Sequence, residues 1–182
     1  AVMPLYVALE GPDGAGKSTA VDALEDALNA VSVRTLAFHH ASPGNVDPWP
    51  AALDYARQRA ELVARVKNMT DPPRVVLCDR WSLSTRVLGR VIGAGCDEGC
   101  GLLGFGAAEE WMLRDQRYVI LDAPLSVLHE RLTARGEQVD PEALAAVREA
   151  YRTTASAHAI VDTSRPRAEV LAQLVAIVQG WL

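Results

Sequence analysis

Lysine is nearly absent from this sequence. Lys17 and Lys67 are the only lysines, and 23 acidic residues against 18 lysines and arginines give a net charge of −5. A chain with this balance has no overall basic field, so we expect no direct nucleic-acid partner. Local arginine side chains must therefore hold any small anionic ligand. Against this background, a lysine that falls inside a recognisable motif is hard to attribute to chance.

Cysteines and long apolar runs are also scarce. The three cysteines are an odd number, and no basic-then-apolar leader opens the sequence, so a reduced, cytoplasmic setting is expected. No apolar run reaches the ~20 residues of a membrane span, so no membrane partner is expected. The 182 residues are enough for a single domain, residues 1–182, which would bury about 70% of its unfolded surface.

A glycine-rich loop follows the first apolar run. Leu5–Leu9 leads into Glu10–Thr19, which contains G-x-x-x-x-G-K-[ST], and a helical pattern follows. In this setting, backbone N–H groups and the helix N-terminus point at a bound polyphosphate, the lysine reaches the β- and γ-phosphates, and the serine ligates Mg²⁺. The alternative is a glycine-rich turn that binds nothing. The motif predicts a nucleoside triphosphate site formed by Gly11, Asp13, Gly14, Ala15, Gly16, Lys17, Ser18 and Thr19.

Short apolar runs alternate with longer helical patterns along the whole chain. Strands are predicted at Leu5–Leu9, Val33–Phe38, Arg74–Cys78, Tyr118–Leu121 and His158–Val161. Helices are predicted at Lys17–Ala30, Ala51–Asn68, Ser82–Val91, Ala107–Arg114, Leu125–Ala134, Pro141–Ala157 and Arg167–Trp181. Almost wholly apolar strands separated by helices indicate an α/β fold, with a buried parallel sheet covered on both faces. Ligands of such folds bind at the carboxyl ends of the strands.

The third predicted strand ends in a charged pair. Asp79, directly after this strand, reaches the same sheet edge as the glycine-rich loop, where a second magnesium ligand is needed. Arg80 offers a fork of donors to a second phosphate-bearing substrate. The alternative is an aspartate that caps the next helix beside an arginine in solvent. Next to the glycine-rich loop, the functional interpretation is favoured.

These features together resemble the thymidylate kinases, in family order over nearly the whole chain. The resemblance is carried by Glu10-Gly11, Asp13-Gly14-Ala15-Gly16-Lys17-Ser18-Thr19, Asp79-Arg80-Trp81-Ser82-Leu83-Ser84, Leu121-Asp122-Ala123-Pro124, Arg131, Arg135-Gly136, Val147-Arg148-Glu149-Ala150-Tyr151 and Ile160-Val161-Asp162-Thr163-Ser164. It implies a three-layer P-loop kinase fold with a five-stranded parallel sheet and a short mobile lid at about 131–140. It also implies phosphate transfer from ATP to a deoxynucleoside monophosphate. A homodimer is implied as well, and the apolar helices after Ala51 or Ser82 are candidates for its contact.

The resemblance assigns the acceptor nucleotide to four side chains. Asp13 matches a carboxylate beside the 3′-hydroxyl, and Arg80 matches the arginine that grips the acceptor phosphate. Tyr55 matches an aromatic that stacks on thymine, and Arg59 matches an arginine that bonds a base carbonyl. One helical turn separates these two residues, so they share a helix face. The alternative for Tyr55 is an ordinary core aromatic.

Two arginines match the family's lid. Arg131 and Arg135 would close over the transferring phosphoryl group, and they must supply charge because Gly14 stands where some relatives carry arginine. The alternative is a solvated pair of arginines on an ordinary helix. The resemblance therefore implies these catalytic residues: Lys17, Asp13, Arg80, Arg131 and Arg135.

Several positions depart from the family pattern. His39 and His40 stand where an arginine usually contacts the acceptor phosphate; either substitutes for it or has a structural role. Thr85 remains to bond a pyrimidine ring nitrogen, and Leu88 stands where an aromatic usually discriminates against a 2′-hydroxyl. These changes do not fix the base of the acceptor, which is dTMP or a related or modified pyrimidine deoxynucleotide.

The segment with Cys96 and Cys100 is interpreted as a loop with free thiols. A disulfide is the second interpretation and a zinc site the third.

The implied reaction is in-line phosphoryl transfer. The acceptor phosphate is already anionic, so no general base is required, and catalysis consists of screening charge and aligning two phosphates. Two other classes stay open. A deoxynucleoside kinase needs a carboxylate base, usually after the second strand, where His39-His40-Ala41 offers none. A nucleotide-dependent switch of the GTPase type carries an Asn-Lys-x-Asp motif, which this sequence lacks.

Overall fold

A computed structural model of the chain describes residues 4–41, 48–92, 101 and 116–182. The elements along the chain are β1 (Leu5–Glu10), α1 (Lys17–Ala30), β2 (Thr35–His39), α2 (Pro48–Lys67), β3 (Val75–Asp79), α3 (Ser82–Ile92), β4 (Gln116–Asp122), α5 (Leu125–Ala134), α6 (Pro141–Arg152), β5 (Ala159–Asp162) and α7 (Arg167–Gln179). All five predicted strands are confirmed, with ends that differ by at most two residues. The predicted helix Ala107–Arg114 lies outside the described residues.

Helix α6 begins as predicted but ends earlier. Asp140 caps it by accepting from the backbone N–H of Glu142 at 2.9 Å, and proline follows at the first helical position. The predicted end at Ala157 is wrong, because the helix stops at Arg152. The Thr153 hydroxyl donates to the Glu149 carbonyl at 2.8 Å. Hydroxyl side chains that compete in this way for backbone groups disfavour further helix.

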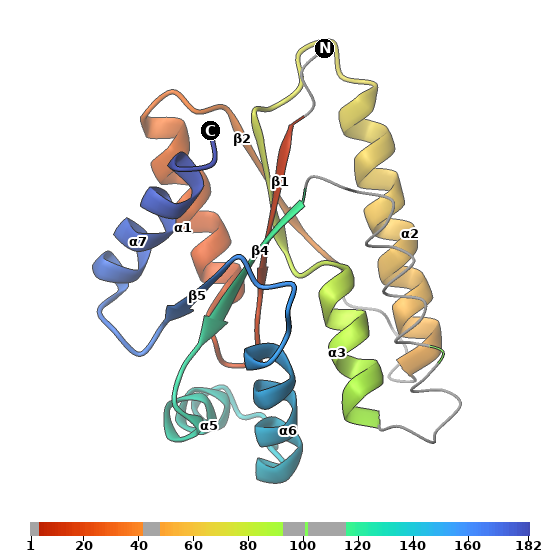
Figure 1. Cartoon of the computed structure of the whole chain (residues 1–182), viewed down its shortest axis with the longest axis vertical. Helices are drawn as coiled ribbons and strands as arrows, with labels where there is room; N and C mark the ends of the chain where they lie inside the picture. Colours follow the sequence, from red (N-terminus) through yellow and green to blue (C-terminus); the bar gives the residue numbers. More distant parts are fainter. Residues whose placement is uncertain (1–3, 42–47, 93–100, 102–115) are drawn as a thin grey trace.

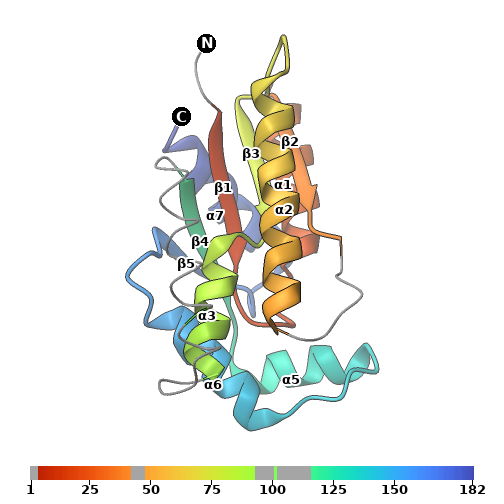
Figure 2. The same ribbon diagram turned by 90° about the vertical axis from the view of Figure 1, so that its right-hand side faces the viewer.

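The five strands form one sheet in the order β2-β3-β1-β4-β5. Every neighbouring pair is parallel, so all strands end at the same edge. Leu9 of β1 lies opposite Asp79 of β3, which brings the loop after β1 beside the end of β3. Helices α5 and α6 lie beyond this edge in both views (Figures 1 and 2). The topology therefore places the loop after β1, the end of β3, α5 and α6 at one end of the molecule.

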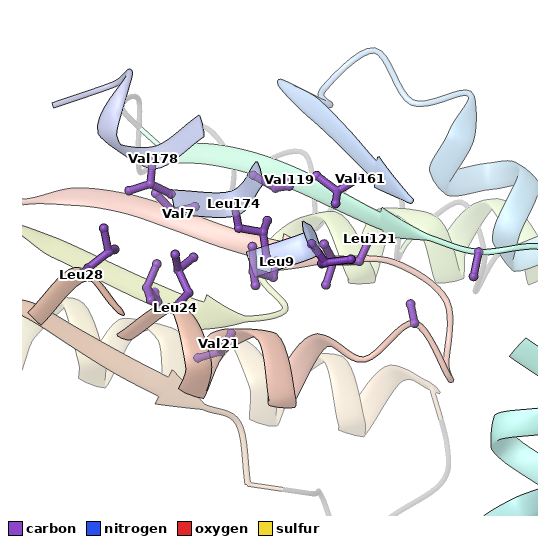
Figure 3. Packing of buried hydrophobic residues seen from close by; sticks show 14 of the residues in the cluster. Val7, Leu9, Val21, Leu24, Leu28, Val119, Leu121, Val161, Leu174 and Val178 are labelled. Atoms are coloured by element: carbon purple, nitrogen blue, oxygen red, sulfur yellow. The ribbon is translucent and has the colours of Figure 1, made fainter. Parts of the chain in front are cut away.

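Alternation along each strand divides the core into two layers. Helices α1 and α7 cover one face of the sheet, and α2 and α3 cover the other (Figures 1 and 2). Figure 3 shows the first layer, in which side chains of the strands meet those of α1 and α7. Its labelled members are Val7, Leu9, Val21, Leu24, Leu28, Val119, Leu121, Val161, Leu174 and Val178. The second layer includes Tyr6, Ala8, Leu62, Val66, Val76, Trp81, Leu83, Val87, Tyr118, Ile120 and Tyr151.

The first layer supplies a test of the fold. Leu24 of α1 is fully buried, so Leu24→Ala is expected to lower the free energy of unfolding by about 2–5 kcal/mol. Urea denaturation followed by circular dichroism measures it. Leu125→Ala is the matched control, because Leu125 is 37% exposed, and a change within about 0.5 kcal/mol is expected there. Equal losses for both variants would contradict the described packing.

No helix in the described part of the chain has the length and apolar character needed to span a membrane.

Candidate active site

The loop between β1 and α1 turns on glycines that no other residue replaces easily. Gly11 has φ 143°, and a Cβ atom there would collide with the carbonyl oxygen of Leu121. Gly16 precedes α1 in a left-handed conformation, with φ 83°. Both conformations favour glycine because a Cβ atom is strained at positive φ. Helix α1 begins directly after Gly16, and its first residues line a cavity together with Gly14 and Gly16, as the motif predicts.

Lys17 lies over this loop. Its Nζ donates to the carbonyl oxygens of Gly11 at 3.0 Å and Pro12 at 2.7 Å, and it lies 3.8 Å from Oδ1 of Asp13. The side chain is only 7% exposed. Burial, reinforced by the like charge of Arg80, lowers the pKa of Lys17 to about 7. A polyanion placed against Nζ would favour the charged form.

The two residues predicted to ligate magnesium are in contact. Ser18 Oγ, in the first turn of α1, donates to Oδ2 of Asp79 at the end of β3. Next to them, His39 places Nδ1 3.2 Å from the same Oδ2 and Nε2 2.8 Å from Oδ1 of Asp22. Burial alone would lower the pKa of His39, but these carboxylates outweigh it, so the pKa is raised. A hydroxyl and a carboxylate are the hard oxygen donors that Mg²⁺ prefers.

Arg80, which is predicted to bind an acceptor phosphate, lies against the glycine-rich loop. Its backbone φ is 70°, a left-handed conformation that typically costs about 1–3 kcal/mol outside glycine. One terminal nitrogen donates to the Gly11 carbonyl at 3.2 Å, and the other donates to the Asp13 carboxylate. Burial alone would lower the pKa of Arg80, but the neighbouring tyrosine and acidic groups raise it above its ordinary value. The guanidinium is therefore a permanent cation held against the loop.

Three adjoining cavities converge on this loop. The central cavity, of about 260 Å³, is lined by Asp13, Gly14, Gly16, Lys17, Ser18, Thr19, His40, Tyr55, Asp79, Arg80 and Arg135. The arginine cavity, of about 370 Å³, is lined by Gly14, Ala15, Gly16, Thr19, Ala20, Ala23, Arg131, Ala134, Arg135, Thr163, Arg165, Arg167, Val170, Leu171 and Leu174. The aromatic cavity, of about 350 Å³, is lined by Asp13, His40, Ala51, Ala52, Tyr55, Arg59, Arg80, Trp81, Ser84, Thr85, Val87, Leu88, Val147 and Tyr151.

The aromatic cavity brings together all the predicted acceptor residues. Tyr55 presents its ring edge-on to His40, with 5.2 Å between centroids and 88° between planes. Arg59 is only 4% exposed, and its guanidinium lies 5.9 Å from the ring centroid of Trp81, within the range of a cation–π interaction. Thr85 is likewise buried. A flat polar ring would find both an aromatic face and a fixed cation here.

His40, one of two histidines considered as substitutes for the family's arginine, is held against the backbone at the end of β3. Its Nδ1 lies 2.9 Å from the carbonyl oxygen of Asp79. A carbonyl only accepts, so Nδ1 carries the proton. Burial lowers the pKa of His40 to about 4, so the ring is neutral near pH 7. His40 therefore brings no positive charge to a phosphate.

The two predicted lid arginines have separate surroundings. Arg131, in the last turn of α5, donates to the carbonyl oxygens of Gly14 at 3.2 Å and Thr163 at 2.7 Å. Arg135 directly follows α5, and its Nε lies 3.0 Å from Oε1 of Glu137. Arg135 lines both the central and the arginine cavity, whereas Arg131 lines only the latter. The segment with Cys96 and Cys100 lies outside the described residues.

Two buried carboxylates beside the site, Glu10 and Asp122, were not predicted as site residues. Glu10 is completely buried below the loop, and it accepts from the Trp81 backbone N–H at 2.6 Å. Asp122 at the end of β4 binds two arginines of α6: Arg148 through two hydrogen bonds of 2.8 and 2.9 Å, and Arg152 at 2.7 Å. Both carboxylates end an apolar strand, a pattern that could have marked them as candidates. No local sequence pattern predicts the residues that they bind, which lie far away along the chain.

Comparison with known proteins identifies relatives of similar length. No protein-family model matches the chain. A thymidylate kinase of Bordetella petrii is 31% identical over 96% of this chain and 95% of its own length. A thymidylate kinase of Leifsonia xyli is 30% identical over 97% and 95%, and one of Pseudomonas fluorescens is 28% identical over 98% and 96%. With the sheet order, the glycine-rich loop and the charged end of β3 described above, these similarities show that the chain belongs to the thymidylate kinase family.

Proposed function

We propose that this protein transfers the γ-phosphate of ATP to the 5′-phosphate of dTMP, or of a related pyrimidine deoxynucleotide, and produces the diphosphate and ADP. The observation that carries the proposal is the row of three cavities. The central cavity shares Arg135 with the arginine cavity and Arg80 with the aromatic cavity, and Lys17 lines the space between them. Two nucleotides bound in the outer cavities would meet phosphate to phosphate at the loop.

The arginine cavity suits the donor nucleotide. Backbone N–H groups of the loop and the α1 N-terminus favour a polyphosphate, and Arg165 and Arg167 add positive charge at the rim. Leu171 and Leu174 of α7 offer an apolar wall for a purine ring. Ser18 and Asp79 fit a Mg²⁺ ion, which when bound would neutralise charge on the donor phosphates.

The aromatic cavity suits the acceptor. Arg80 would bind its 5′-phosphate, and Asp13 would lie beside the sugar. Tyr55 would stack on the base, Arg59 would donate to a base carbonyl, and Thr85 would bond a ring nitrogen. A pyrimidine with carbonyl oxygens matches these donors better than a base that offers only amino groups.

The chemistry then needs no general base. An oxygen of the acceptor phosphate attacks the γ-phosphorus, the bond from this phosphorus to the β–γ bridging oxygen breaks, and ADP leaves with that electron pair. Lys17, Arg80 and Arg135 would screen the two phosphates from each other during transfer, while Arg131 would hold the loop through the Gly14 carbonyl. Charge stabilisation of this kind is the largest contribution in many enzymes.

A substrate panel tests the proposal. Purified protein is incubated with ATP and Mg²⁺ and, one at a time, with dTMP, 5-substituted deoxyuridine monophosphates, dCMP, dAMP, dGMP, UMP and thymidine, and products are separated by anion-exchange chromatography. We expect the products to be dTDP or a related pyrimidine diphosphate, together with an equal amount of ADP. Thymidine turnover would instead indicate a deoxynucleoside kinase. ATP binding without any product would indicate a non-catalytic nucleotide-binding protein.

The predicted assembly and location stay predictions. Trp49 and Leu53 of α2 are 39% and 48% exposed, which supports a homodimer contact through this helix.

A further inference from the structure

The hydroxyl group of Tyr151 lies at a junction that sequence patterns do not reveal. Tyr151 belongs to α6 and is 1% exposed. Its oxygen lies 3.1 Å from a terminal nitrogen of Arg80, 2.9 Å from Oγ of Ser84 and 3.2 Å from Oε2 of Glu10. Three chain segments, at the ends of β1, β3 and α6, therefore meet at one phenol oxygen.

The hydrogen-bond directions in this cluster are restricted. The guanidinium of Arg80 only donates, so the Tyr151 oxygen must accept from it. Ser84 Oγ donates to Oε2 of Glu10 at 2.6 Å, and the Tyr151 proton is left for Glu10 or Ser84. Burial raises the pKa of Tyr151, so the phenol stays protonated. Tyr151 thus links the cation of Arg80 to the buried carboxyl group of Glu10.

Arg80 needs such support because of its backbone. Its φ of 70° is unusual for a residue with a side chain, and surrounding contacts must compensate for the strain. The Arg80 backbone N–H donates to the Leu9 carbonyl at 3.0 Å, and the next N–H, of Trp81, donates to Glu10. Glu10 therefore holds the backbone after Arg80, while Tyr151 holds the side chain.

Helix α6 is itself fixed to the sheet. Arg148, one helical turn before Tyr151, binds the buried Asp122 through two hydrogen bonds, a geometry that restricts both groups. The phenol is thus carried by an element anchored at the edge where the strands end. A side chain on a free helix would not position Arg80 in this way.

We propose that Tyr151 is a positioning residue, which orients the Arg80 guanidinium toward the 5′-phosphate of the acceptor nucleotide; this inference rests on the proposed function. Tyr151 acts through Arg80 and not on the reacting atoms. Its removal should therefore weaken use of the acceptor and spare use of ATP.

The experiment compares Tyr151→Phe with the wild type and with Tyr6→Phe. Tyr6 is the matched control, because its ring lies in the same core layer, and its buried hydroxyl has no hydrogen-bond partner among the described residues. Steady-state assays give KM for dTMP and for ATP, and calorimetry gives the affinity for dTMP alone. Tyr151→Phe is expected to raise KM and Kd for dTMP about tenfold, the effect of one hydrogen bond to a charged group. Its KM for ATP should stay within about twofold, and Tyr6→Phe should match the wild type in all three.

The outcomes separate this inference from the proposed function. Wild-type turnover with an unchanged dTMP KM in Tyr151→Phe would overturn the inference alone, and so would equal rises of KM for both substrates, which indicate a merely structural role. Absence of turnover in the wild type would overturn the proposed function, and this inference with it. If Tyr151→Phe does not fold, Ser84→Ala, which removes another acceptor of Arg80 at 3.3 Å, carries the same acceptor-selective expectation.

Discussion

Replacing Lys17 with alanine is expected to leave the protein folded and to lower turnover by about 10²–10³-fold, the typical cost of removing one preorganised donor that stabilises charge in a transition state. Its Nζ donates to carbonyl oxygens of its own loop, so its loss should hardly disturb the tertiary structure. Burial of an ammonium group also costs free energy. The free energy of unfolding should therefore change by no more than about 1 kcal/mol.

The sequence supplies a matched control for this variant. Lys67 is the other lysine and is exposed in the last turn of α2. Lys67→Ala should retain wild-type kcat, KM and urea midpoint. If Lys17→Ala kept wild-type turnover of dTMP, the loop would not be the phosphoryl-transfer site.

Replacing Arg80 with alanine is expected to weaken the use of dTMP and to have much less effect on the use of ATP. KM for dTMP should rise about 100-fold, because the variant loses a partly buried guanidinium that would make two or more charged hydrogen bonds to the acceptor phosphate. KM for ATP should change much less, since the proposed donor site, the arginine cavity, lies on the other side of the central cavity and is not lined by Arg80. Initial-rate measurements with each substrate varied at saturating levels of the other distinguish the two constants.

Arg90→Ala is the matched control. It also removes an arginine, but Arg90 is exposed in the last turn of α3, the helix that follows Arg80. It should leave both KM values unchanged. Equal increases for dTMP and ATP in Arg80→Ala would mean that Arg80 does not define the acceptor site.

The parts of the site that are contiguous in sequence were predictable. The conformation of the loop from Glu10 to Thr19 is determined locally, because glycines at fixed spacing allow positive φ and the helix begins directly after them. Asp79 was predictable for a related reason. Parallel strands end at one edge, so a carboxylate at the end of β3 must reach the loop after β1.

Contacts between distant segments were not predictable in the same way. Glu10 and Tyr151 are separated by 141 positions, and nothing local to either residue specifies the other. The state of His40 depends on the Asp79 carbonyl and on burial among aromatic rings, which only the folded chain supplies. The early end of α6 likewise depends on the hydrogen bond that the Thr153 hydroxyl donates to the Glu149 carbonyl, which competes with helix propensity.

The most direct measurement is a crystal structure of the protein with dTMP, Mg²⁺ and a non-hydrolysable ATP analogue. We expect the triphosphate on the loop at Lys17, the dTMP phosphate within hydrogen-bond distance of Arg80, and the thymine ring against Tyr55. The γ-phosphorus should face an acceptor-phosphate oxygen across the central cavity. A triphosphate bound away from the loop, or a dTMP phosphate without contact to Arg80, would contradict it.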